Sequence, residues 1–289
     1  MMPEGPEIRR AVDKLARLLA GKRAVLVRFA PDKFPGLQPA GRRLSGRMIG
    51  AIEARGKVIL THFDCGAAIY SHNQLYGQWA IYRGAPPVSH LQTRLTIATV
   101  SHTAVLYSAS EIAVLDTSTI ERHPYIAKLG VELLDPRVTV QQVLVHIEQP
   151  RFARRNLAVL LLDQSFLSGV GNYLRSEILF TARLHPSACV AGLATQQRQA
   201  LANSALNLTR RSYRTGGITN DRAIAARLKS EGVAFGRYRH WVFDREGEPC
   251  HQCSHRIRRI DAGSRNLYLC EHCQPQDADS SKQALHGKH

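Results

Sequence analysis

Four cysteines near the carboxyl end of the chain have the spacing of a metal site. They read Cys250-x2-Cys253-x16-Cys270-x2-Cys273, two close pairs separated by one longer segment. Two such pairs about fifteen to twenty residues apart are typical of a tetrahedral zinc site, and the segment between them reads as a hairpin. The pattern predicts one structural Zn²⁺ bound by these four thiolates.

A second group of chemically useful residues lies close to the start of the chain, in Pro3-Glu4-Gly5-Pro6-Glu7. Gly5-Pro6 favours a helix start, because proline in the first turn lacks only an N–H that would be unpaired. A carboxylate at Glu7 is then stabilised by the helix dipole. From these residues alone, a polar entry to a helix and a set of reactive groups are equally good interpretations.

A third stretch, Gly169-Val170-Gly171-Asn172, joins two expected helices. The glycines would let backbone amides approach a phosphate closely, and Asn172 stands where a helix N-cap belongs. The same stretch also fits a plain corner between helices, and both interpretations remain open. It is not a dinucleotide-binding fingerprint, because the glycines follow a helix rather than a strand.

Composition narrows the function classes. The chain has 289 residues, 44% of them hydrophobic, which is enough for two compact domains. Lysine and arginine number 39 against 23 acids, a net charge of +16 that favours nucleic acid as partner. No apolar run approaches the ~18 residues that a membrane span needs. The start lacks the apolar core of a secretory signal, so we expect a cytoplasmic protein without a membrane partner.

Hydrophobic periodicity predicts the elements that position these residues. Ile8, Val12, Leu15 and Leu19 recur at helical spacing, and Gly21 follows as a stop. Short β-branched runs then indicate an antiparallel sandwich or barrel, at 24–30, 47–54, 58–63, 67–71, 78–82, 94–100 and 103–108. From about residue 139 the period becomes helical, in segments 140–148, 155–163, 173–184 and 195–213.

These patterns divide the chain into consecutive parts. We expect an N-terminal β-sandwich domain, a linker, a helical domain, a zinc finger and a disordered tail, at 1–125, 126–138, 139–240, 241–275 and 276–289. The tail lacks apolar periodicity, which is why no packed structure is expected there.

Five ordered motifs together resemble the bacterial formamidopyrimidine-DNA glycosylase/endonuclease VIII family. They are PEGPE, ARGK, SHNQLYG, LLDQSFLSGVGNYLRSEIL and VFDREGEPC, followed by the final cysteine pair, and they span residues 3–273. The resemblance implies an α+β multidomain protein with an N-terminal helix and antiparallel β-sandwich, a helix–two-turn–helix bundle and a C-terminal zinc-ribbon-type finger. It makes 1–125 the catalytic domain and 139–240 the DNA-binding domain.

The resemblance also implies roles for individual residues. Pro3, as a chain terminus, is the nucleophile that forms a Schiff base, and Glu4 is the acid that protonates the sugar or the leaving group. Lys57 assists β-elimination, Arg265 grips phosphate and assists δ-elimination, and Glu7 is a supporting carboxylate. The residues implied to contact DNA are Gln74, Leu75, Tyr76, Lys128 and Asn172.

The implied function is a bifunctional DNA glycosylase and AP lyase of base-excision repair. The contiguous Gln74-Leu75-Tyr76 resembles the endonuclease VIII wedge, which predicts oxidised pyrimidines as substrates. An 8-oxoguanine and formamidopyrimidine enzyme of the same family is the alternative. A second alternative for this stretch is a hairpin in which Leu75 and Tyr76 are simply buried. The expected partner is double-stranded DNA with oxidised bases or abasic sites, bound by a monomer at the bacterial nucleoid.

Three features depart from the family pattern. Met1-Met2 precedes the proline where the family has one methionine, so we expect translation to start at Met2. A blocked Pro3 would instead give a catalytically silent damage-binding protein. Lys128 stands where the family more often has arginine, and 214–240 is a long loop with a Gly-Gly pair that resembles the other branch. A zinc-ribbon transcription or ribosome-associated protein would leave PEGPE, ARGK and SHNQLYG unexplained.

Overall fold

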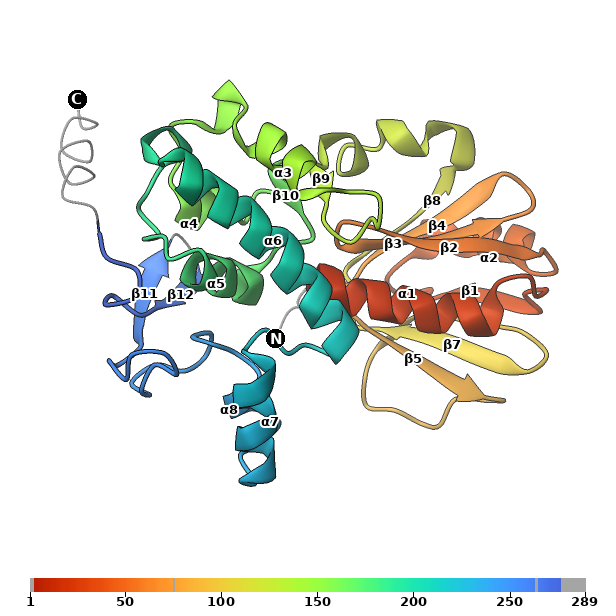
Figure 1. Cartoon of the computed structure of the whole chain (residues 1–289). Coiled ribbons are helices and arrows are strands. Elements are labelled where there is room, and N and C mark those ends of the chain that lie inside the picture. The colour runs from red at the N-terminus through yellow and green to blue at the C-terminus, as the bar shows by residue number, and fades with distance from the viewer. Residues whose placement is uncertain (1–2, 75, 263–264, 277–289) are drawn as a thin grey trace. The chain divides into compact units, whose positions relative to one another are not determined.

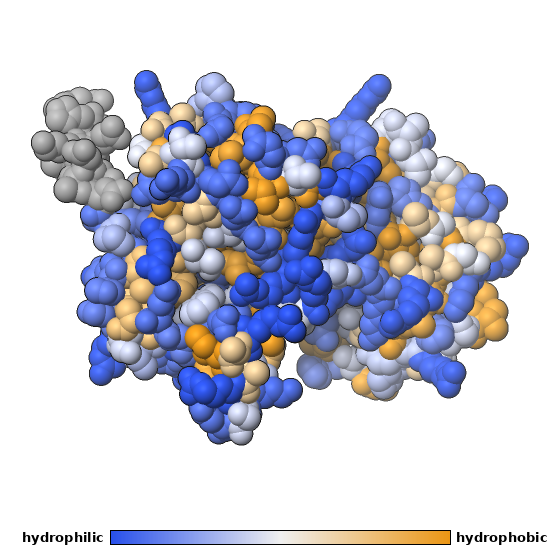
Figure 2. Space-filling view, in the orientation of Figure 1, coloured by the Kyte–Doolittle hydropathy of each residue, from blue (hydrophilic) through white to orange (hydrophobic). Residues whose placement is uncertain are grey.

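The computed structural model describes residues 3–74, 76–262 and 265–276, and the chain divides into two compact units, Met1–Lys128 and Leu129–His289 (Figure 1). Across the described residues, no helix combines the length and the apolar character that a bilayer span requires. Hydrophilic residues cover much of the face seen in Figure 2.

The first unit opens with helix α1, Gly5–Leu19, which has Pro6 in its first turn. The side chains of Ile8, Val12, Leu15 and Leu19 are all buried on one face, so the helix and its buried stripe are confirmed. A short helix α2, Gln38–Leu44, was not expected from the sequence.

Two four-stranded antiparallel sheets follow. Their strand orders are β1-β6-β7-β5 and β2-β3-β4-β8. The strands are β1 Leu26–Phe29, β2 Ile49–Arg55, β3 Val58–Phe63, β4 Ala67–His72, β5 Gln78–Arg83, β6 Thr93–Ala98, β7 His102–Tyr107 and β8 Glu111–Asp116. One hydrophobic core joins both sheets to α1, which confirms the predicted sandwich.

Strand β3 is buried on both faces, which explains its continuous apolar run. Ile59 packs into the core that the two sheets share, whereas Val58 and Leu60 point to the opposite side of their sheet. There they contact a second cluster with Ile120 and Ile126, from the 3₁₀ helices Thr117–Arg122 and Ile126–Lys128. The strand is therefore fixed from both sides.

The second unit is mainly helical. Its elements are a parallel pair of two-residue strands, β9 Val131–Glu132 and β10 Leu167–Ser168, and helices α3 Val140–Ile147, α4 Leu157–Leu160, α5 Asn172–Thr181 and α6 Thr195–Thr215. The helix expected over 155–163 shrinks to α4, which Asn156 caps by accepting a hydrogen bond from the Val159 N–H at 3.0 Å.

Segment 214–240 is not a plain loop, so that expectation is wrong. It contains α7, Arg222–Ser230, and α8, Phe235–Tyr238. Asp221 caps α7 through its carboxylate, and Gly216 ends α6 in the left-handed conformation at φ 74°. The sequence signal was weak because only Ala225 is fully buried in α7.

The expected hairpin between the cysteine pairs is present. Strand β11, Arg258–Ala262, pairs antiparallel with β12, Arg265–Leu269, in register from Arg258–Leu269 to Ala262–Arg265. Of the tail, only Gln276 lies within the described residues, so the prediction of disorder there stays a prediction.

Candidate active site and zinc centre

The residues predicted to react first lie at the beginning of α1. Glu4 is the N-cap residue and is only 2% exposed, and its N–H donates to the Glu7 carboxylate at 3.1 Å. Glu7 also pairs with Arg10 at 2.7 Å. Pro3 precedes this cap and is half-buried. The structure therefore places Pro3, Glu4 and Glu7 together on a fixed helix end.

A second group gathers at one end of the β2-β3-β4-β8 sheet. Val58 pairs with His72 in the β3–β4 register, so the Gly56-Lys57 turn and the turn after His72 lie at the same end. Lys57 is 8% exposed, and its backbone N–H donates to the Tyr125 hydroxyl at 3.1 Å. The structure thus brings Lys57 beside the turn that contains Gln74 and Tyr76.

His72 connects these turns electrostatically. Its Nδ1 lies 3.3 Å from Glu111 Oε2, and its ring centroid lies 5.3 Å from that of Tyr125. Burial lowers the pKa of His72 and the Lys57 charge adds to that effect, although Glu111 acts in the opposite direction. Sequence analysis gave no role to His72, although this residue lies within the SHNQLYG motif. It also gave none to Glu111 or Tyr125, which lie in none of the quoted motifs.

The turn after His72 is tight and presents an aromatic ring. The Gly77 N–H donates to the Asn73 carbonyl at 2.7 Å, and a Cβ on Gly77 would lie 2.3 Å from that oxygen, so only glycine fits. Gln74 has φ 49° and is held by Ser110 and by Glu111, the latter at 3.4 Å. Tyr76 is 79% exposed, so its burial in a hairpin is excluded. Leu75 lies outside the described residues.

In the second unit, Asn172 does not cap its helix, so that prediction is wrong. Gly171 is the N-cap of α5, and Asn172 is the first helical residue. Its Oδ1 instead accepts a hydrogen bond from Arg175 Nη2 at 2.7 Å. The Gly169 N–H, expected to face phosphate, donates to Gln164 Oε1 at 3.0 Å.

Arg175 links Asn172 to the zinc hairpin. Its side chain is fully buried, and Nη1 donates to the Ala158 carbonyl at 2.8 Å. Nη2 reaches the carbonyls of Arg265 at 3.4 Å and Asn266 at 3.1 Å as well as Asn172. Two residues predicted to hold phosphate, Asn172 and Arg265, are thereby positioned by one guanidinium.

The two residues after Arg175 also anchor the finger to α5. The Ser176 hydroxyl accepts from the Tyr268 N–H at 3.2 Å. The fully buried Glu177 carboxylate accepts from Thr219 Oγ1 at 2.6 Å and from three consecutive backbone amides at 2.8 to 2.9 Å, those of Trp241, Val242 and Phe243. Burial raises the pKa of Glu177, and these donors oppose that shift. Sequence analysis missed this anchoring, although charged residues inside an apolar helix were a signal.

The four cysteines converge as a metal centre. Their Sγ atoms are 3.4 Å apart for Cys253–Cys270 and Cys253–Cys273, and 4.0 Å apart for Cys250–Cys273. A tetrahedral zinc with bonds of ~2.3 Å would place its sulfurs about 3.8 Å apart. The donor set therefore fits one structural Zn²⁺, as the sequence predicted.

The remaining predicted residues lie at the edges of these groups. Lys128 is exposed at the end of the 3₁₀ helix whose Ile126 is buried under the sheet. Arg265 is half-buried at the first position of β12.

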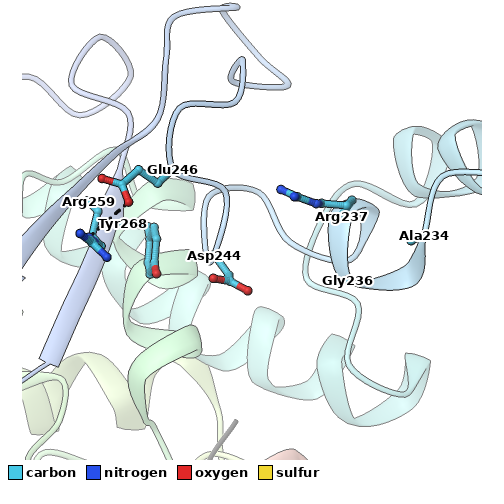
Figure 3. A pocket seen from close by; sticks show the side chains of 7 residues that line it. All are labelled: Ala234, Gly236, Arg237, Asp244, Glu246, Arg259 and Tyr268. Carbon is cyan, nitrogen blue, oxygen red and sulfur yellow. Dashed lines mark ion pairs between the residues drawn. The ribbon is translucent and has the colours of Figure 1, made fainter.

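A pocket of about 500 Å³ in the second unit contains none of the predicted site residues (Figure 3). Its lining residues are Ala234, Gly236, Arg237, Asp244, Glu246, Arg259 and Tyr268. Arg259 pairs with Glu246 at 3.3 Å, as the dashed line in Figure 3 marks. Arg237 pairs with Glu248, which is not among the residues that line the pocket. Because both arginines are compensated by acids, this pocket does not have the character of a phosphate site.

Family models match three stretches of the chain. Residues 2–119 match the N-terminal domain of formamidopyrimidine-DNA glycosylase, 129–223 match its H2TH domain, and 247–276 match the zinc finger found in FPG and IleRS. Over 274 residues the chain is 42% identical to endonuclease 8 of Pectobacterium atrosepticum and of Klebsiella pneumoniae. Those alignments cover 94% of this chain and 100% of each relative.

Solved structures agree in fold. A complex of Lactococcus lactis Fpg with DNA containing an abasic site has a TM-score of 0.78 at 19% identity, covering 94% of this chain and 100% of that one. Wild-type L. lactis Fpg with DNA containing an oxidised pyrimidine has a TM-score of 0.79 at 19% identity, over 95% and 100%.

These matches define the class: a DNA glycosylase with AP lyase activity, acting in base-excision repair. Within it, the chain belongs to the formamidopyrimidine-DNA glycosylase/endonuclease VIII family, as its motifs predicted.

Proposed function

We propose that this chain removes oxidised pyrimidines from duplex DNA and then cuts the strand by β,δ-elimination. The observation that carries the substrate class is the tight turn that presents Tyr76 beside the buried Lys57. The identity of 42% to two relatives named endonuclease 8 supports the same branch. The high positive charge supports a DNA partner bound largely through its phosphates.

The first chemical step uses Pro3 as an amino-terminal secondary amine. Such groups titrate near ~7.7–8.0, so a useful neutral fraction exists at pH 7. The nitrogen attacks C1′ as the bond from C1′ to the base breaks, and the base leaves with that electron pair and a proton. Glu4 supplies a proton to the sugar or the leaving group. The product is an iminium between Pro3 and the opened sugar.

Strand cleavage follows from the iminium. It acidifies the C2′ hydrogen, so loss of that proton expels the 3′ phosphate, with Lys57 assisting. A second elimination expels the 5′ phosphate with Arg265 assisting, and water then releases Pro3. Lys128 and Asn172 hold the DNA backbone, which positions the strand without reading sequence.

The turn at Gln74-Leu75-Tyr76 serves base extrusion. Rotating a nucleotide out of the duplex costs a few kcal/mol and leaves a void. An apolar or aromatic wedge in that void offsets part of the lost stacking. The enzyme acts as a monomer in the bacterial cytoplasm, at the nucleoid, a location supported by its bacterial relatives.

Covalent capture tests the chemistry. Protein processed to Pro3 should form a borohydride-reduced adduct with duplex that contains an oxidised pyrimidine. The same protein with one extra residue before Pro3 should bind this duplex but form no adduct. Efficient trapping by a chain shown by mass to retain Met1 and Met2 would contradict the role of Pro3. Binding without trapping by the processed protein would instead indicate a silent damage-binding protein.

Lesion ranking tests the substrate class. Excision of a ring-saturated pyrimidine should exceed excision of 8-oxoguanine opposite cytosine. Leu75→Ala should slow excision from duplex more than from single strands, where no void forms. Val88→Ala, at a fully exposed position in the same unit, is the matched control and should leave excision from both duplex and single strands unchanged. The reverse ranking would assign the chain to the 8-oxoguanine branch.

A further inference from the structure

One arginine of the second unit, Arg239, differs from its neighbours in having no acceptor. Arg175, Arg210 and Arg211 each donate at least one hydrogen bond to a backbone carbonyl, at 2.8 to 3.1 Å. Within the part of the chain that the structure describes, the guanidinium of Arg239 takes part in no hydrogen bond or ion pair, and its Nε is buried. A buried charged donor without an acceptor costs free energy, so its position calls for an explanation.

The Arg239 guanidinium is nevertheless held in place. Its Cζ lies 4.9 Å from the centroid of the Phe235 ring and 5.9 Å from that of the Tyr173 ring, both within the range of cation–π attraction. The Arg239 carbonyl accepts hydrogen bonds from the N–H groups of Thr219 and Asn220, at 2.8 and 3.0 Å. Ring and backbone contacts therefore fix a cation whose nitrogens have no acceptor.

Gly217 makes room for this guanidinium. A Cβ on Gly217 would lie 2.9 Å from Arg239 Nη2 and 3.3 Å from its Cζ. The backbone at Gly217 has φ 111°, a conformation that residues with a side chain rarely adopt. In the Gly216-Gly217 pair, Gly216 ends α6, and Gly217 admits Arg239. A constrained backbone position thus accommodates an arginine that has no partner of its own.

The segment that contains Arg239 is strongly basic. Residues 214–240 include six lysines and arginines and only two acids. One acid, Asp221, caps α7, and the other, Glu231, pairs with Arg227 at 2.8 Å. Both acids are therefore already engaged, and the excess of positive charge favours an anion in this part of the unit.

Phosphate is the anion that suits such a guanidinium. A planar guanidinium stacked on aromatic rings presents N–H groups at its edge, and these bind phosphate oxygens in pairs. Arg239 is only half-buried, so solvent reaches its Nη end although Nε is buried. Tyr173, the ring on which it stacks, directly follows Asn172, the residue proposed to hold the DNA backbone.

We propose that Arg239 binds a backbone phosphate of duplex DNA through its Nη groups, in addition to the contacts proposed for Asn172 and Arg265. Because the contact is with phosphate, it adds affinity and does not read sequence. The proposal rests on the duplex binding proposed for this unit, and it does not depend on the reaction assigned to Pro3.

The salt dependence of binding tests this contact. Affinity is measured against NaCl concentration for a duplex with a tetrahydrofuran abasic analogue, which has no leaving group at C1′. Arg239→Met should reduce the log–log slope by about 0.9, the value for one phosphate. Arg239→Lys should keep the slope but bind more weakly, because a lysine cannot form the paired hydrogen bonds. Arg227→Met, which removes a paired charge from the same segment, is the control and should leave the slope unchanged.

Arginine modification of the wild-type protein gives a second test that needs no substitution. Phenylglyoxal should modify Arg239 in the free protein, and the same duplex should protect it. Arg17, exposed in the last turn of α1, should react equally with and without duplex. The proposal is overturned by an unchanged slope in Arg239→Met or by an equal change in Arg227→Met. It is also overturned if Arg239 fails to react in the free protein or is not protected.

Borohydride trapping separates this proposal from the proposed chemistry. Processed Arg239→Met protein should still form the covalent adduct at saturating lesion duplex, since Pro3 is unchanged. Absence of an adduct in wild type would contradict the role of Pro3, while the salt slope would still decide the role of Arg239.

Discussion

The two groups of predicted site residues are held in place by different physics. In the first unit, α1 and the β2-β3-β4-β8 sheet pack against one continuous apolar core. The polar contacts of Glu4 and Lys57 lie at the edge of that core. In the second unit, Asn172 and Arg265 depend on a buried guanidinium, a buried carboxylate and a metal.

The two units should therefore respond differently to the loss of a single side chain. Apolar packing is distributed over many side chains, so loss of one contact is tolerated more easily than loss of one buried polar hub. We expect the part of the second unit that is proposed to bind phosphate, at Asn172 and Arg265, to lose its structure without damage to the helix end that holds Pro3. The two tryptophans, Trp79 and Trp241, lie in different units and can report on them separately.

Metal loss should have the largest effect. Cys270→Ser removes one of four zinc ligands, and structural zinc supplies apparent binding energies of about 10–16 kcal/mol in small modules. The amides of β11 and β12 should lose hydrogen-exchange protection and duplex affinity should fall, while β3 and β4 stay protected. Cys65→Ser, a half-buried cysteine in the first unit, is the control. Full protection of β11 and β12 in Cys270→Ser would contradict this account.

Removal of the buried guanidinium should come next. Arg175→Met leaves its buried acceptors without a donor, at ~1–3 kcal/mol for each group. The free energy of unfolding reported by Trp241 should fall by about 3 kcal/mol or more. Arg137→Met makes the same change at a side chain that is 88% exposed and pairs with Asp135, so it should destabilise the protein much less. An equal loss of unfolding free energy in Arg175→Met and Arg137→Met would show that burial of the guanidinium does not matter for stability.

Acid should weaken the second unit through His240. Burial lowers the pKa of this ring well below its usual value, and Arg239 and Arg245 add to the effect. The unfolded chain then takes up a proton that the folded chain does not, so stability is complete above pH ~6.5 and falls below it. One such group contributes up to about 1.4 kcal/mol per pH unit. Urea unfolding of wild type and His240→Gln, followed from pH 7.5 to about 5, should differ in this slope.

The smallest effect is expected at the beginning of α1. Glu7→Gln keeps an acceptor for the Glu4 N–H but removes the charge at the helix start, which is worth about 0.3–1 kcal/mol. Trp79 should report a loss of this size in urea unfolding. Asp13→Asn, in the middle of the same helix, should cost less. A loss of several kcal/mol of unfolding free energy in Glu7→Gln would show that the first unit also depends on a single polar side chain, as the second unit does on Arg175.

Strong periodicity explains what could be predicted. Helix α1 and most strands followed from apolar spacing, and the zinc centre followed from cysteine spacing alone. Strand β8 was missed because only Ile112 is buried in it. The positions of Arg175 and Glu177 could not be inferred, because most of their partners are backbone groups roughly sixty to ninety residues away that no residue type marks. The error at Asn172 is a shift of one position, within the usual uncertainty of helix ends.

Because β3 is buried on both faces, the turn after His72 can change in sequence without moving the strand. A slip of one residue would turn every β3 side chain to the wrong face, so the pairing of Val58 with His72 cannot drift. The position of Lys57 is therefore independent of which residues occupy 74–76. Under the role proposed for residues 74–76, lesion preference can change through these three residues while Lys57 keeps its position.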